Sequence, residues 1–266
     1  MRLIKTTLFL LLVSFFYSCE KVIELKLDAE EIKYVIEGII TNKPGDCKVY
    51  VSQSRPFYEN NQFTGISGVN VVVYDNGNAY PLTETGAGIY ENKQLNGMPG
   101  HVYELSVTIN GESFTATCTM PQPVYLDKLF IAPGPFGQFD FATIEYTDPV
   151  GIKNFYRYVQ YVNNVKDPAI FWDNDEFADG LLISRLLDTG IDKKDDPRNI
   201  ESGDIVTIEL LSLDESIYTY WYSLQSDGGA GSGSAIAPAN PLTNIKGGAL
   251  GYFSAHTLDS KTVIAP

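Results

Sequence analysis

Histidine is scarce in this chain, because His101 and His256 are the only two among its 266 residues. The sequence also has no Gly-x-Ser-x-Gly elbow and no His-Glu-x-x-His pair, which are signatures of serine hydrolases and zinc peptidases. A serine triad would need one of these histidines, and neither has a recognisable partner, so both are predicted to be structural. We therefore predict that the protein is not an enzyme. The many carboxylates leave a glycosidase as an open alternative.

Basic residues are also few, with 19 Lys and Arg against 33 Asp and Glu. Without Arg2 and Lys5, which lie in the first eighteen residues, 17 basic residues face the 33 acidic ones, a net charge of −16. Nucleic-acid phosphates need Lys and Arg partners, and so does attachment to anionic lipid. The charge therefore argues against both.

A long apolar run is missing as well. The longest stretch, Leu8 to Tyr17, is about half of the roughly 20 residues that a membrane-spanning helix needs, so a transmembrane anchor is not expected. It follows Arg2 and Lys5 and ends just before Ser18 and Cys19, which is the order of a signal peptide with a lipoprotein cleavage site. We predict that residues 1–18 are removed and that the Cys19 thiol carries a diacylglycerol anchor. A plain secretory signal and a buried core thiol at Cys19 are the alternatives.

Cysteine is the third scarce residue. Lipidation of Cys19 leaves Cys47 and Cys118, each on the apolar side of a predicted strand. An exported protein can meet an oxidising compartment, so a disulfide between them is allowed. Two buried thiols are the alternative, and the sequence leaves both open.

Between residues 33 and 120 the sequence favours β-strands. Apolar and polar residues alternate, and turn sequences recur at roughly 8–12-residue spacing. Asp75-Asn76-Gly77-Asn78 is a hairpin signal. After a tether over residues 19–32, we predict a β-sandwich domain with strands at 34–40, 47–54, 69–74, 79–82, 88–90, 101–109 and 112–120.

Beyond Pro121-Gln122-Pro123, which is the predicted boundary, the chain becomes richer in aromatic residues. We predict a second, β-rich domain over residues 121–266. Its strands are expected at 125–131, 139–147, 154–162, 180–188 and 204–213, and a final hairpin is expected from 250–255 and 261–265.

One helix is predicted near residues 215–226, with Asp214 as its N-cap. Its apolar side chains recur at helical spacing and should face the core; they are Ile217, Tyr220, Trp221 and Leu224. A stretch rich in Gly, Ser, Ala, Pro and Asn follows, from Gly228 to Gly248. Loops of this length are often functional, so it is a candidate to close over a ligand or against a receptor, and a mobile surface loop is the alternative.

Three motifs in the first domain occur together in a known scaffold. They are Gly68-Val69-Asn70-Val71-Val72-Val73, Gly88-Ile89-Tyr90, and the Pro99-Gly100 turn before Tyr103 to Val107. In this order they resemble the transthyretin-like and carboxypeptidase-regulatory-like β-sandwiches. That resemblance implies an immunoglobulin-like or transthyretin-like scaffold and no catalytic residue. The predicted fold class is thus mainly β, with an N-terminal sandwich and a second β-rich domain that contains one helix.

The whole mature chain resembles a family of Bacteroidetes outer-membrane lipoproteins catalogued as a domain of unknown function. The likeness is carried by the Cys19-Glu20-Lys21-Val22-Ile23 start, by Ile36-Glu37-Gly38, by the helix from Tyr218 to Leu224 and above all by the segment from Asn240 to Phe253. It implies an outer-membrane location and the company of TonB-dependent receptors, which take up nutrients.

Acidic turns are the candidate metal sites. Asp173, Asp175 and Asp179 place hard oxygen ligands in one turn, so we hypothesise a weak calcium site there. Asp192, Asp195 and Asp196 form a second such turn. Neither has the spacing of an EF-hand, and a polar loop without metal is the alternative.

Trp172 borders the first acidic turn and is a candidate to stack on a sugar or peptide, with packing at the core or rim as the alternative. Asn240 and Asn244 are further candidate ligand contacts. From these observations we predict a non-enzymatic outer-membrane lipoprotein that acts as a binding or docking subunit of a TonB-dependent nutrient receptor. A structural or adhesive surface lipoprotein that binds glycan or matrix is the rival.

Overall fold

The computed structural model describes residues 32–55, 62–135, 137, 139–191, 193, 195–228 and 240–266. In these residues β-strands dominate and there is one helix, which confirms the predicted mainly-β fold. The strands are β1 Tyr34–Thr41, β2 Cys47–Gln53, β3 Asn70–Asp75, β4 Asn78–Pro81, β5 Thr83–Gly86, β6 Ile89–Glu91, β7 Val102–Ile109, β8 Glu112–Thr119, β9 Leu126–Pro133, β10 Asp140–Thr147, β11 Phe155–Val162, β12 Val165–Lys166, β13 Phe171–Asn174, β14 Leu182–Leu186, β15 Ile205–Ser212 and β16 Leu250–Ile264, and the helix is α2 Glu215–Gly228.

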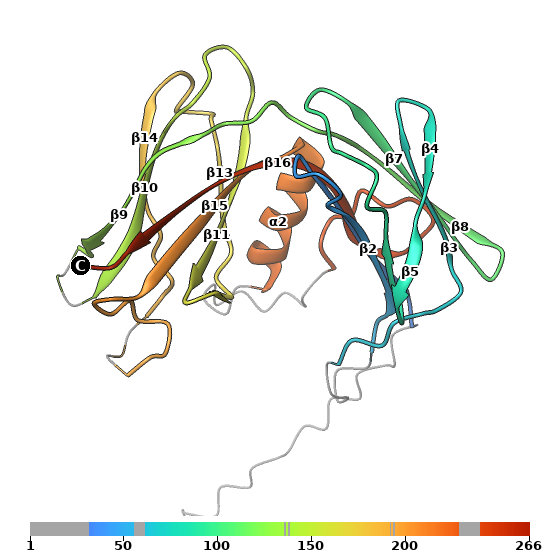
Figure 1. Ribbon diagram of the computed structural model, residues 1–266, viewed down its shortest axis with the longest axis horizontal. Helices are drawn as coiled ribbons and strands as arrows, with labels where there is room; N and C mark the ends of the chain where they lie inside the picture. Colours follow the sequence, from blue (N-terminus) through green and yellow to red (C-terminus); the bar gives the residue numbers. More distant parts are fainter. Residues whose placement is uncertain are drawn as a thin grey trace, which may run out of the picture. The chain divides into compact units, whose positions relative to one another are not determined.

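Strand β16 is the longest element and organises the strands around it (Figure 1). Its first half pairs in parallel with β1, from Leu250 to His256. Its second half pairs antiparallel with β15, from Thr257 to Ile264. The resulting nine-stranded sheet has the order β12-β11-β15-β16-β1-β2-β6-β5, and β13 pairs with β11.

The other two sheets are smaller, with orders β4-β3-β7-β8 and β14-β10-β9. Each adds its apolar face to a buried cluster that the large sheet completes. One cluster contains Val71 and Leu105 with Ile36, and the other contains Ile144 with Ile208. The nine-stranded sheet therefore runs across the predicted boundary at residues 121–123, and Ile32–Pro266 form one compact unit.

The predicted final hairpin is wrong, because β16 continues without a turn from Leu250 to Ile264. Asp259 and Ser260 resemble turn residues, but they pair with Leu210 and Glu209 of β15. The Asp259 carboxylate accepts a hydrogen bond of 2.9 Å from the backbone N–H of Leu126, so this charged residue is satisfied within the strand.

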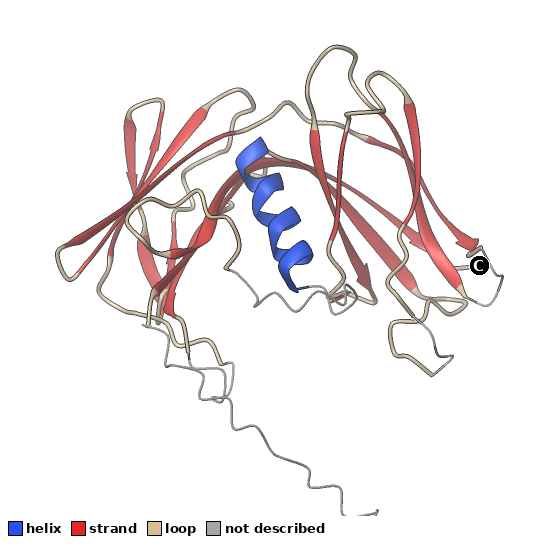
Figure 2. Cartoon of the chain, turned by 180° about the vertical axis from the view of Figure 1, so that it is seen from behind, coloured by secondary structure: helices blue, strands red, loops and turns tan. Residues whose placement is uncertain are grey.

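The helix forms where the sequence predicts it. Asp214 caps it by accepting a 2.9 Å hydrogen bond from the N–H of Ser216. Ile217 and Tyr220 are buried, whereas Trp221 is only partly buried. Figure 2 shows α2 from behind, and it contacts β11, β13 and β16. Within the described part of the chain, no helix has the length and apolar character needed to cross a membrane.

Candidate functional site

Two surfaces hold the side chains of interest: a pair of loops that carries the predicted calcium ligands, and a groove on the nine-stranded sheet. The loops connect β10 to β11 and β13 to β14. The carboxylates of Asp175 and Asp179 come together there, but their third neighbour is Asp148, with ligand atoms all within 4.8 Å of one another. Asp173 lies instead on β13, where its carboxylate is 3.5 Å from the Arg185 guanidinium. Asp148 was not predicted as a ligand from the sequence, where the Asp148-Pro149 turn was the available signal.

These three carboxylates hold the two loops together. Asp148 accepts a 3.2 Å hydrogen bond from Gly180 N–H and another from the Tyr156 hydroxyl. Asp179 accepts one of 2.6 Å from Gly151 N–H, and Asp175 accepts one of 2.8 Å from Asn154 N–H.

The three carboxylates bring negative charge together where the two loops meet. Burial raises the pKa of Asp148 above its usual range, and the charges of Asp175 and Asp179 add to the rise. A hard cation would relieve the repulsion among the three carboxylates.

The same loops, together with the first residue of β14, carry exposed apolar side chains, which we call the apolar loop patch. Its members are exposed by 54% to 88%: Val150, Ile152, Phe177, Leu181 and Leu182. Scattered apolar residues are normal on a surface, whereas several on two loops that are bound together make this patch a candidate for binding.

Trp172 lies partly buried on β13. Its ring packs edge-on against Tyr222 and Tyr218, at centroid distances of 4.9 and 5.7 Å, and its indole N–H donates to Gln225. It also lines an open depression of about 500 Å³ together with Arg185 and Asp188. The Trp172 side chain therefore packs against α2 and is also partly accessible to solvent.

Asn244 is held by the protein itself. Its amide N–H₂ donates to the carbonyl of Phe253 at 2.8 Å, and its amide oxygen accepts from the N–H of Phe253 at 2.9 Å. Both ends of the side chain therefore fasten the segment to β16. Asn240 is exposed. Residues 229–239 of the glycine-rich loop lie outside the described residues.

Cys47 and Cys118 are free and buried. Of the two arrangements that the sequence left open, the structure has the buried thiols. Burial raises the pKa of each thiol to about 12, so both stay protonated at neutral pH. The Cys118 sulfur also accepts a 3.1 Å hydrogen bond from Ala255 N–H. Cys19 lies outside the described residues.

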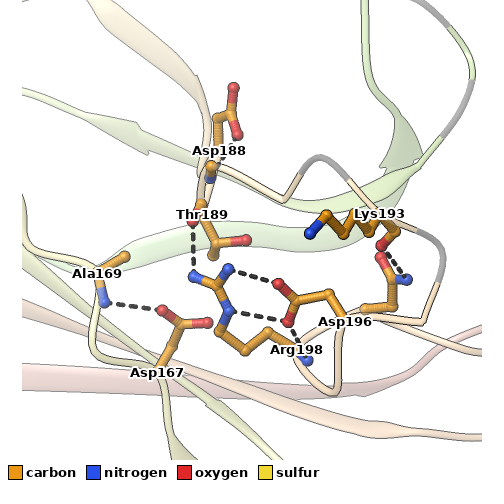
Figure 3. A network of polar contacts seen from close by, with 9 residues as sticks. Asp167, Ala169, Asp188, Thr189, Lys193, Asp196 and Arg198 are labelled. Carbon is orange, nitrogen blue, oxygen red and sulfur yellow. Dashed lines mark hydrogen bonds and ion pairs between the residues drawn. The ribbon is translucent and has the colours of Figure 1, made fainter. Parts of the chain in front are cut away.

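A polar network stands at the second acidic turn (Figure 3). The Arg198 guanidinium donates to the Asp196 carboxylate at 2.6 and 3.0 Å and to the carbonyl of Thr189 at 3.0 Å. The Arg198 partner lowers the pKa of Asp196 to about 2. Asp196 is therefore an arginine partner here, while Asp192 lies outside the described residues.

The groove lies on the face of the nine-stranded sheet that α2 partly covers. It is a cavity of about 300 Å³ lined by residues of β1, β2, β11, β12, β15, β16 and α2. Strand alternation explains the composition of its floor, because every second residue of β11 points into it; these are Arg157, Val159 and Tyr161.

Arg157 is the central residue of the groove. Its guanidinium Cζ lies 3.5 Å from the ring centroid of Trp221, which is a cation–π contact. Its Nε is buried and has no hydrogen-bond partner among the described residues. Burial lowers the pKa of Arg157.

The groove is lined by four basic side chains, Lys43, Lys48, Arg157 and Lys166, and by two acidic ones, Asp46 and Glu209. Lys43 is 3.7 Å from Glu209, and Lys48 is 3.2 Å from Glu91 outside the groove. Burial and the charge of Arg157 lower the pKa of Lys166. This site was not predicted from the sequence, since its residues come from strands that are far apart along the chain.

Ser254 and His256 also line the groove, and the Ser254 hydroxyl is 2.8 Å from His256 Nδ1. Burial lowers the pKa of His256 to about 4, and the charge of Arg157 contributes, so its imidazole is neutral at pH 7. Among the described residues no carboxylate hydrogen-bonds this histidine, and so the pair lacks the orienting acid of a catalytic triad. The other histidine, His101, lies outside the groove lining, with its Nδ1 2.7 Å from the Asp75 carboxylate.

Comparison with known families supports the predicted membership of a family of unknown function. The chain belongs to the family described as Domain of unknown function (DUF4249), whose model matches residues 20–262. No curated protein matches the chain.

Proposed function

We propose that this member of the DUF4249 family is a non-enzymatic lipoprotein of the outer membrane that docks onto a TonB-dependent receptor and assists nutrient uptake. Its anchor is the diacylglycerol on Cys19, which the signal pattern of residues 1–19 supports. Its outer-membrane location is supported by the resemblance to outer-membrane lipoproteins. Two acyl chains hold a protein firmly at a membrane, so the acidic chain needs no electrostatic attraction to lipid.

The observation that carries the docking role is the apolar loop patch. Phe177 is 88% exposed and Val150 is 78% exposed, although water-exposed apolar surface of this kind is costly. Asp148 and Asp179 bind the two loops to each other, so the patch is presented on a prearranged surface. A rigid apolar surface loses little conformational entropy on binding, which favours association with a protein partner.

Membrane anchoring strengthens such docking without new contacts. A receptor and a lipoprotein in the same membrane meet at a high effective concentration, so modest affinity is sufficient. The patch therefore needs to supply only part of the binding energy that a soluble complex would require.

The test is co-purification from gently solubilised outer membrane. We expect a β-barrel receptor to co-purify with the wild-type protein and to be lost with Phe177→Ser. Ile264→Ser is the matched control, since Ile264 is 66% exposed but lies at the end of β16. Recovery of no barrel, together with binding on a glycan array, would replace the docking role by the adhesive one.

A further inference from the structure

We propose that the groove binds a small organic oxyanion, a carboxylate or phosphate attached to a ring, and that Arg157 and Lys166 hold its charge. This inference goes beyond the docking proposal and needs neither a receptor nor a lipid anchor. It rests on the hydrogen bonding of Arg157, on the balance of charges in the groove and on the residues around them.

The first observation is the incomplete hydrogen bonding of Arg157. Its guanidinium face is covered by Trp221, so only its edge can bind a partner. The Nε–H on that edge is buried without an acceptor among the described residues. A buried donor without an acceptor costs free energy, and the cost is larger when the donor is charged. A carboxylate or phosphate fits an arginine edge with two parallel hydrogen bonds and would remove this cost.

The second observation is the sign of the charge. Lys43 and Lys48 have acidic partners at 3.7 and 3.2 Å. Arg157 and Lys166 have no ion pair within 4 Å among the described residues, although the whole chain has a net charge of −14. Burial lowers the pKa of both residues, and the nearby charge of Glu209 offsets this only in part. A basic recess in an acidic protein concentrates anions at that point.

The third observation concerns the body of the ligand. Beside the two cations, the groove offers aromatic and aliphatic surface from Tyr50, Trp221, Tyr252 and Val159. Its volume of about 300 Å³ is at the lower end of small-molecule sites. The C–H face of a sugar ring packs on aromatic side chains, so a ring that carries one oxyanion, such as a sugar acid or sugar phosphate, matches the site.

The test is calorimetric titration of the detergent-solubilised full-length protein with D-glucuronate, glucose 6-phosphate and glucose. We expect saturable binding of at least one of the two anions and none of glucose, which shares the ring but has no charge. The two anions distinguish a carboxylate ligand from a phosphate ligand. Binding should weaken as salt is added, since part of the energy is electrostatic.

Variants locate the site. Arg157→Gln should weaken binding of the anion roughly tenfold or more, and Lys166→Gln should weaken it by a smaller factor. Lys246→Gln is the matched control, because it removes one positive charge from an exposed position outside the groove lining. If Arg157→Gln does not fold, Lys166→Gln at the exposed rim carries the test alone.

Two outcomes would overturn the inference. Absence of saturable binding by both anions would mean that water satisfies Arg157, and equal binding by Lys166→Gln and wild type would place the anion elsewhere. Neither result would affect co-purification of a receptor through the apolar loop patch, so the two proposals fail independently.

Discussion

The guanidinium of Arg157 on β11 lies over the indole ring of Trp221 on α2, with 3.5 Å between Cζ and the ring centroid. This contact joins the only helix of the described residues to the floor of the groove. Arg157 is half-buried and has no ion pair within 4 Å among the described residues, an arrangement that costs stability.

Arg157→Met should therefore stabilise the protein. Methionine keeps most of the volume of the side chain and removes a partly desolvated, unpaired charge, whose cost we expect to exceed the roughly 1–2 kcal/mol of the cation–π contact. We expect the free energy of unfolding in urea to rise by about 1–2 kcal/mol. Arg185→Met, which changes a half-exposed arginine, should alter it little. A loss above about 2 kcal/mol for Arg157→Met would show that Arg157 is a structural residue.

His256 should make the protein less stable at acidic pH. Its pKa is about 4 when folded and 6.5 when unfolded, so between these values the unfolded chain binds the proton and the folded chain does not. Protonation of His256 therefore leaves the free energy of unfolding unchanged above pH 6.5. It lowers that free energy as the pH drops toward 4, by about 3 kcal/mol in all. In urea unfolding at several pH values, His256→Gln should lose less stability over this range. If the stability of wild type and of His256→Gln fell in parallel with pH, the conclusion that the His256 imidazole is buried and neutral would be wrong.

Gly251 should be essential for the pairing of β16 with β1. Its φ is +95°, and an added Cβ would lie 2.1 Å from the carbonyl oxygen of Ile36 in the neighbouring strand. Gly248 has φ +90° but open space around it. In thermal or urea unfolding, Gly248→Ala should cost about 1 kcal/mol from backbone strain, and Gly251→Ala should cost more than about 3 kcal/mol. Equal losses for the two variants would mean that the parallel ladder relaxes at no cost.

Calcium should bind at Asp148, Asp175 and Asp179. With a dissociation constant near 1 mM, typical of weak extracellular sites, 10 mM calcium would raise the free energy of unfolding by about 1.4 kcal/mol. Asp179→Asn should remove this effect, whereas Asp173→Asn should keep it, because Asp173 lies on β13 beside Arg185. Calorimetry and unfolding curves that do not change on calcium addition would remove the site.

Local features of the fold could be predicted from the sequence. Strand alternation and turn residues located most strands, and the spacing of Ile217 and Tyr220 located α2, because these signals depend on neighbouring residues. The parallel pairing of β1 with β16 joins residues more than 200 positions apart. Strand alternation cannot identify a partner at that distance, and so the shared sheet was not predicted.

The site residues follow the same rule: those close together in the sequence were predicted, and those from distant segments were not. Asp175 and Asp179 were found because they share one turn, whereas Asp148 joins them from another loop and replaces the expected Asp173. Arg157 and Lys166 look like ordinary strand charges in the sequence. Their importance depends on burial and on missing partners, which only the packing of α2 and six strands reveals.

The central claim is that a lipid on Cys19 places this protein in the outer membrane, and its most direct test is fractionation of cells that express wild type or Cys19→Ser. We predict that wild type remains in the outer-membrane pellet after a carbonate wash and that its amino-terminal peptide has the mass of an acylated cysteine. The Cys19→Ser variant should appear in the wash supernatant. Equal retention of both proteins in the pellet would contradict the account.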